Sequence, residues 1–135
     1  MIANQESKSS TEETFGPVIN SYSRAQAIED GTLIDVSETA LEAGIKFPTA
    51  LTRNVWNQYV AIPKGVQGQD ESGRLWDILW MLHHAIKTGQ GGSDILYPLY
   101  VRNNNHRADF IHLRAICGPG DDWAPVITIM MPDED

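Results

Sequence analysis

The strongest hydrophobic pattern in the chain lies between Ser72, which can cap a helix, and Gly89, which can end one. Four aliphatic side chains recur there at intervals of four and three residues: Leu75, Leu79, Leu82 and Ile86. This is the period of an α-helix, and Trp76, Trp80 and His83 widen the apolar stripe on one flank. A stripe of this width predicts one long amphipathic helix that packs against a sheet.

The period changes in the C-terminal part of the chain. Residues 95–101 are rich in β-branched and aromatic side chains, and residues 109–117 alternate in polarity. Residues 103–106 between them have the composition of a turn, so the two segments predict a β-hairpin. Residues 126–131 predict a last strand. We therefore expect about three antiparallel C-terminal strands.

The segment before the long helix predicts a short helix followed by a short strand. Residues 23–31 suit a helix that Ser23 caps and Gly31 ends. Residues 32–36 suit a strand because apolar and β-branched side chains predominate there.

Two more helices are predicted further along this segment. The first covers residues 38–43, with Ser37 as its cap and Gly44 as its end. The second has Pro48 in its first turn and ends at Pro63. Its apolar stripe consists of Leu51, Val55, Trp56 and Tyr59.

These elements indicate one α+β domain over residues 16–135, preceded by a polar tail. Residues 1–15 hold almost no apolar side chains, and we expect them to be a disordered tail. A chain of 135 residues has room for one modest core. In the predicted domain, about three antiparallel C-terminal strands pack on one long amphipathic helix, with short helices at the N-terminal side.

Charge argues against direct contact with nucleic acid. The chain has 18 acidic and 10 basic residues, a formal net charge of −8. Residues 121–135 carry acids and no base, so the body of the domain is nearly neutral. The basic cluster on the predicted hairpin is too small for more than weak phosphate contact. It consists of Arg102, His106, Arg107 and Arg114.

The single cysteine, Cys117, excludes an intrachain disulfide and favours a reducing compartment. We expect its thiol to be buried and inert. The first residues lack the basic and apolar regions of a signal peptide, and no apolar run reaches the length of a membrane-spanning helix. A cytoplasmic protein that does not enter a membrane is therefore expected.

Four ordered blocks of sequence carry a resemblance. They are SRAQA…DG…LIDV at residues 23–36, ALTRNVW at 50–56, GRLWDILWML at 73–82, and CGPGDD…PVITIM at 117–130. Together they resemble a family of small uncharacterised proteins carried by bacteriophages, plasmids and other bacterial mobile elements. The resemblance covers about residues 18–131 and implies a bacterial host cell as the setting. It implies no activity and no functional residue. Because small proteins of such elements often counter host defences, it points to a counter-defence or host-modulating role.

Three arginines and two tryptophans in these blocks are candidate binding residues: Arg24, Arg53, Arg74, Trp56 and Trp76. A guanidinium binds anions in a bidentate manner, and an indole ring can stack on a base. If the fold brings these side chains together, they line a pocket for a phosphate or a nucleotide.

Arg74 and Asp77 lie three residues apart at the start of the long helix. This spacing suits a local ion pair. It also places Arg74 beside the free N–H groups of a helix N-terminus, which is the arrangement of an anion site. Trp76 between them suits either the core or a stacking platform.

Gly118, Gly120, Asp121 and Asp122 belong to the most conspicuous loop of the sequence. It lacks the lysine and hydroxyl residue of a phosphate-binding loop, and it suits a tight connection between two strands. A second interpretation is that its carboxylates hold Mg²⁺ or contact an arginine of a partner.

No metal, cofactor or catalytic residue is predicted. His83 and His84 are adjacent, so their side chains diverge on a helix, and no Cys-x-x-Cys or His-x-x-x-His pair occurs. Motifs of serine nucleophiles are also absent from the sequence.

We therefore expect a non-catalytic binding protein of a phage or mobile element. Its partner would be a host protein, met by exposed aromatics such as Phe110 or Trp123, or a small nucleotide signal held by the arginines. Self-association into a homo-oligomer is compatible with this interpretation. The alternative is a small nucleotide-acting enzyme, a transferase or hydrolase, with Asp35 or Asp77 as its base. A third hypothesis is an accessory to plasmid or phage maintenance.

Overall fold

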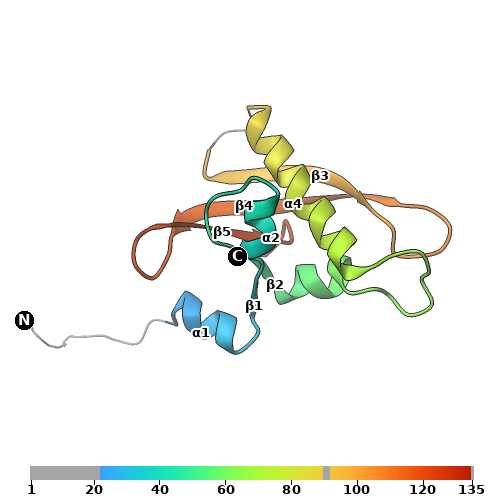
Figure 1. Ribbon diagram of the computed structural model, residues 1–135, viewed down its shortest axis with the longest axis horizontal. Coiled ribbons are helices and arrows are strands. Elements are labelled where there is room, and N and C mark those ends of the chain that lie inside the picture. The colour runs from blue at the N-terminus through green and yellow to red at the C-terminus, as the bar shows by residue number, and fades with distance from the viewer. Residues whose placement is uncertain (1–21, 90–91, 135) are drawn as a thin grey trace, which may run out of the picture.

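A five-stranded mixed sheet forms the centre of the computed structural model, which describes residues 22–89 and 92–134 (Figure 1). The predicted tail at 1–15 and the first residues of the predicted domain lie outside the described residues. The strand order is β1-β2-β5-β4-β3. The strands are β1 (Leu33–Asp35), β2 (Thr49–Thr52), β3 (Asp94–Val101), β4 (Asp109–Pro119) and β5 (Pro125–Met130).

Helices α2 and α4 pack against each other on one face of the sheet (Figure 1). None of the helices in the described part of the chain combines the length and the apolar character that crossing a membrane requires. The helical elements are α1 (Arg24–Glu29), α2 (Ser37–Glu42), α3 (Arg53–Val55), the π-helix η1 (Trp56–Val60) and α4 (Glu71–Lys87).

The predicted α+β class is confirmed, but the sheet is larger and mixed. β3, β4 and β5 pair antiparallel, as expected for the C-terminal strands. β2 then pairs parallel with β5, and β1 pairs antiparallel with β2. The strand predicted at residues 32–36 corresponds to β1, whereas β2 and the pairing that joins both strands to the C-terminal sheet were missed.

The third predicted helix, from Pro48 to Pro63, is wrong in its first part. Residues 49–52 form the strand β2, and its first three residues, Thr49, Ala50 and Leu51, have no exposed surface. A strand covered on both faces shows no alternation of polar and apolar positions. The apolar residues of β2 were therefore read as part of the apolar stripe of the predicted helix. Helical structure follows only at α3 and η1, where the Ala61 N–H reaches back to the Trp56 carbonyl at 2.8 Å.

The long helix is confirmed, with two corrections. Its N-cap is Asp70, whose Oδ1 accepts from the Gly73 N–H at 2.6 Å, rather than Ser72. Its buried side turns away from the predicted aromatic flank, and Trp76 and Trp80 are 37% and 47% exposed. Because the helix fills the core with narrower side chains, the tryptophans remain at the surface. The apolar side chains that it buries belong to Leu75, Ile78, Leu79, Leu82 and Ala85.

The short N-terminal helices lie where the sequence predicts them. Ser23 caps α1 in a capping box with Gln26. The predicted cap of α2 is wrong, because Ser37 lies inside the helix and donates its hydroxyl to Asp35 at 2.6 Å. Gly44 follows α2 with φ +96°, and a Cβ there would lie 2.8 Å from the His83 ring.

Arg74 connects three segments beneath the hairpin turn. Its guanidinium donates to the Val60 carbonyl at 3.1 Å, the Arg102 carbonyl at 2.7 Å and Asn103 Oδ1 at 2.7 Å. Burial lowers the pKa of Arg74, and the Arg102 guanidinium lowers it further. The residue is only 5% exposed, and every acceptor that the described structure gives it is neutral. Arg74 therefore acts as an internal cross-link between η1, α4 and the end of β3.

We expect Arg74→Met to lower the free energy of unfolding by about 2–4 kcal/mol, because the substitution leaves buried carbonyls without donors. Urea denaturation followed by circular dichroism measures this change. Arg107→Met in the same turn, where the side chain is exposed, is the matched control. Equal effects of the two substitutions would contradict the cross-linking role.

Candidate functional site

An apolar pocket of about 430 Å³ lies between the C-terminal end of α4, the α2–β2 connection and the sheet. This volume is typical of small-molecule and side-chain binding pockets. Its apolar lining consists of Ile45, Phe47, Leu82, Ile86, Ile95, Ala115, Cys117 and Ile127.

The α2–β2 connection shapes the mouth of the pocket. After Gly44, the Ile45 N–H donates to the Ala40 carbonyl at 2.8 Å, and the Ile45 side chain is buried. Phe47 follows and stays 45% exposed, opposite the half-exposed Ile86 of α4. Two large apolar side chains therefore remain partly uncovered at the entrance, where a bound apolar group would cover them.

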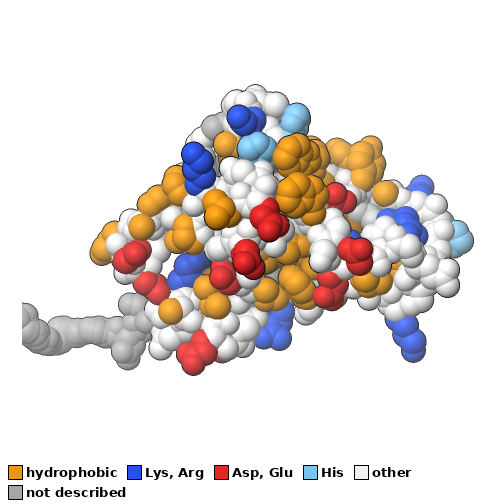
Figure 2. Space-filling model, viewed as in Figure 1, with side chains coloured by type: hydrophobic (Ala, Val, Ile, Leu, Met, Phe, Trp, Pro, Cys, Tyr) orange, Lys and Arg blue, Asp and Glu red, His pale blue; other side chains and the backbone are white. Residues whose placement is uncertain are grey.

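The rim of the pocket is basic. Lys46, Lys87 and His83 line it, and the lining includes no acidic residue. Figure 2 shows basic and histidine side chains around the C-terminal end of α4, whereas acidic side chains gather over α2. The pocket therefore suits a group with an apolar body and a negative charge beside it.

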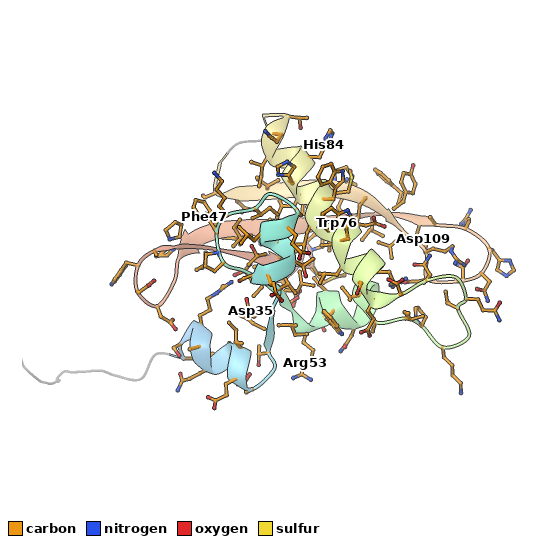
Figure 3. The ribbon with its side chains drawn as sticks, in the orientation of Figure 1. Asp35, Phe47, Arg53, Trp76, His84 and Asp109 are labelled. Carbon is orange, nitrogen blue, oxygen red and sulfur yellow. The ribbon has the colours of Figure 1, made fainter. Side chains whose placement is uncertain are left out.

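An aromatic row continues from the pocket along α4. His83 lines the pocket and stacks on Trp80, with 5.4 Å between the ring centroids. Trp80 in turn stacks on Trp76 at 5.9 Å. In Figure 3, the labelled Trp76 and His84 belong to α4, while the labelled Phe47 comes from the α2–β2 connection. The aromatic row thus extends the apolar surface of the pocket by two helical turns.

The three predicted arginines do not meet in one pocket. Arg24 donates to Thr128 Oγ1 at 2.6 Å, and Thr128 lies on the face of the sheet opposite the pocket-lining Ile127. Arg53 donates to the Gly31 carbonyl at 2.9 Å. Arg74 lies beneath the hairpin turn. Each guanidinium therefore binds oxygens of this chain at a different place, and a role for these arginines in binding stays a prediction.

Gly31 shows how closely Arg53 packs. The glycine has φ +83°, and a Cβ built there would overlap Arg53 Nη2. Arg53 therefore holds the α1–β1 turn against α3. Trp56 is partly buried against the core and does not line the apolar pocket.

Arg74 and Asp77 line a second, polar hollow of about 290 Å³ together with Tyr59, Arg102 and Tyr100. No ion pair joins Arg74 to Asp77 among the described residues. Burial raises the pKa of Asp77. Trp76, the third residue of this predicted group, lies on the exposed side of α4 instead.

The Gly118–Asp122 loop connects β4 to β5 and supports α1. The two carboxylate oxygens of Asp121 accept the Arg24 and Ala25 N–H groups at 2.9 and 3.0 Å. Asp122 accepts the Ala124 N–H at 3.1 Å, and a Cβ at Gly120 would lie 2.8 Å from Val126. These contacts support the interpretation as a tight connection. Gly118 lies within β4.

Sequence reasoning missed the pocket residues Lys46, Phe47 and Lys87. The signal available was an apolar-basic-apolar run, residues 45–47, outside every predicted element. It was insufficient because the run faces residues of α4 and the sheet that are far away in sequence. Within the described ranges, no group of three or more His, Cys, Asp or Glu residues could hold a metal ion.

Asp121→Asn should lower the free energy of unfolding at neutral pH, and this difference from the wild type should disappear in acid. The backbone donors of α1 hold the pKa of Asp121 below its ordinary value of 3.8. Since the pKa of the folded state is depressed, the stabilisation is complete at pH 7 and disappears as the pH falls below about 4. Urea midpoints at several pH values measure this, with Asp133→Asn as the control. A difference from wild type that stays constant in acid would contradict it.

The pocket should bind 1-anilinonaphthalene-8-sulfonate, an apolar body with one negative charge, to the folded protein. Reversing two rim charges in Lys46→Glu/Lys87→Glu should weaken this binding about tenfold, because two favourable charge contacts become repulsive. Lys64→Glu/Arg107→Glu changes the net charge equally away from the pocket and is the control. Fluorescence titration measures both affinities, and equal losses would place the probe elsewhere.

Comparison with known families gives a match over most of the chain. A family model described as a family of unknown function (DUF6573) matches residues 13–135. Searches of curated proteins and of solved structures found no match. Because the family model covers nearly all of the sequence, the chain belongs to the DUF6573 family of unknown function.

Proposed function

We propose that this protein is a non-catalytic binding protein of a bacterial mobile element that binds a host protein through the apolar pocket. In this proposal, one apolar side chain of the partner enters the pocket and covers Phe47 and Ile86. A neighbouring acidic residue of the partner lies against Lys46 and Lys87. The single observation that carries the proposal is an apolar pocket of about 430 Å³ with a basic rim.

The lining favours a protein partner over a nucleotide signal. A base needs hydrogen-bonding groups in fixed positions, but the inner walls of the pocket are aliphatic and aromatic. The arginines suited to phosphate donate elsewhere to this chain's own oxygens. Anchor side chains in apolar pockets with polar rims, in contrast, provide most of the binding energy of protein interfaces.

Binding without turnover is the simplest use of this lining. Cys117 and His83 both line the pocket, and no hydrogen bond joins the thiol to the imidazole in the described structure. Activation of a thiol nucleophile would need such a base beside it. The mobile-element setting and the action on a host component come from the sequence resemblance, which points to a counter-defence or host-modulating role.

Photocrosslinking tests the proposal at the pocket itself. p-Benzoylphenylalanine replaces Phe47 at the entrance or, as the control, Trp123, which is 82% exposed on the β4–β5 loop. We expect a host protein that crosslinks from position 47 and not from position 123. That protein is then identified, purified and titrated against variants.

Phe47→Ala should weaken the purified complex about thirtyfold, as expected for a side chain at the centre of an interface. Lys46→Glu/Lys87→Glu should weaken it as well, whereas Lys64→Glu/Arg107→Glu should not. Unchanged affinity in the pocket variants would overturn the proposal. A nucleotide that raises the midpoint of thermal unfolding and blocks the crosslink would replace the protein partner with a nucleotide signal.

A further inference from the structure

The tryptophan pair on α4 forms an exposed surface that the core does not need. Trp76 and Trp80 stack with an angle of 12° between their ring planes, and both stay at the surface. Leu41 of α2, the helix packed beside α4, is 62% exposed. Large apolar side chains that stay exposed on two packed helices indicate an interaction surface.

The charge around this surface has one sign. Glu38 and Glu42 of α2 and Glu71 and Asp77 of α4 are exposed. The basic residue of these two helices before His83 is Arg74, which is buried and donates inward. Figure 2 shows acidic side chains over α2 beside the hydrophobic side chains of α4.

Indole faces next to carboxylates select a particular chemistry. A guanidinium can lie flat on an indole ring, attracted by its negative face, while its N–H groups donate to neighbouring carboxylates. Nucleic acid is repelled by the four carboxylates. A purely apolar partner would remove those carboxylates from water without compensation.

We propose that the surface formed by Trp76, Trp80, Glu38 and Glu42 binds an arginine-rich segment of a partner protein. This inference rests on the proposed function and adds to it. His83 lines the pocket and stacks on Trp80, so the two surfaces are continuous. The partner therefore presents an acidic residue beside its apolar anchor and arginines about 15 Å further on, the rise of a helix over the ten residues from Trp76 to Ile86.

The probe for this surface is a synthetic peptide of alternating arginine and alanine, titrated by calorimetry at low ionic strength. Peptides with lysine or glutamate in place of arginine, and a single-stranded oligonucleotide, are the comparison ligands. We expect the arginine peptide to bind most tightly, the lysine peptide more weakly, and the other two not at all. Binding of the oligonucleotide in preference to the peptide would overturn the inference.

Variants then locate the peptide. Trp76→Ala/Trp80→Ala should weaken its binding about tenfold. Trp76→Phe/Trp80→Phe should restore part of the affinity. Glu38→Gln/Glu42→Gln should weaken binding by a similar factor and reduce its salt dependence. All these side chains are exposed, and unchanged thermal midpoints confirm that the variants fold.

Matched controls separate this surface from general attraction to an acidic protein. Trp123→Ala removes an exposed tryptophan beside Asp121 and Asp122, and Glu29→Gln/Asp133→Asn removes two other exposed acids. Neither control should change the affinity by more than about twofold. Equal losses in the controls and the surface variants would overturn the assignment.

The pocket variants distinguish failure of this inference from failure of the proposed function. Phe47→Ala should leave binding of the arginine peptide unchanged while it weakens the host-protein complex. If the complex depends on the pocket but no arginine peptide binds, the inference fails and the proposed function stands. If the peptide binds at Trp76 and Trp80 while pocket variants do not affect the complex, the proposed function fails alone.

Discussion

The parallel pairing of β2 with β5 holds the two halves of the chain together, and the other features depend on it. Thr49, Ala50 and Leu51 register with Ile127, Thr128 and Ile129, and the Ile127 N–H donates to the Pro48 carbonyl at 2.8 Å. This pairing fixes the α2–β2 connection next to the sheet. Phe47 consequently lies over residues of β4 and β5, and the apolar pocket closes between segments that are distant in sequence.

Three arginines link segments of the chain, although the Arg53 side chain is exposed. Arg24, Arg53 and Arg74 each donate to carbonyl oxygens of other segments. Their guanidinium groups take the place of backbone N–H donors where these segments meet. A guanidinium suits this role because it satisfies several acceptors from one position. Lysine, whose charge stays in water on a flexible stem, is left for the rim of the pocket. The cations that line the apolar pocket are therefore Lys46 and Lys87, and a role for the arginines in binding stays a prediction.

Periodic segments could be predicted from the sequence, and long-range features could not. The stripe from Leu75 to Leu82 and the alternation in β4 indicate structure because each pattern is complete within its own element. β2 was not predicted as a strand, since burial on both faces removes the alternation of polar and apolar residues that marks a strand. Trp76 was predicted as part of the apolar stripe of α4 but is exposed. The reason is that periodicity gives the width of an apolar surface and not which part of that surface packs against the core. The pocket required knowledge of which loop faces which helix, and only the sheet order supplies that.

A gradient of charge along α4 follows from these constraints. The C-terminal end carries Lys87 and faces Lys46, which complements the negative end of the helix dipole, while Glu71 lies at the positive end. Local helix electrostatics thus explains the direction of the gradient without reference to any partner. It does not explain why Trp76 and Trp80 are exposed along the same line, since smaller polar side chains would stabilise an exposed helix face equally well. The coincidence of an electrostatic gradient with an uncovered aromatic row supports the proposal that this side of the molecule recognises a partner in a defined orientation.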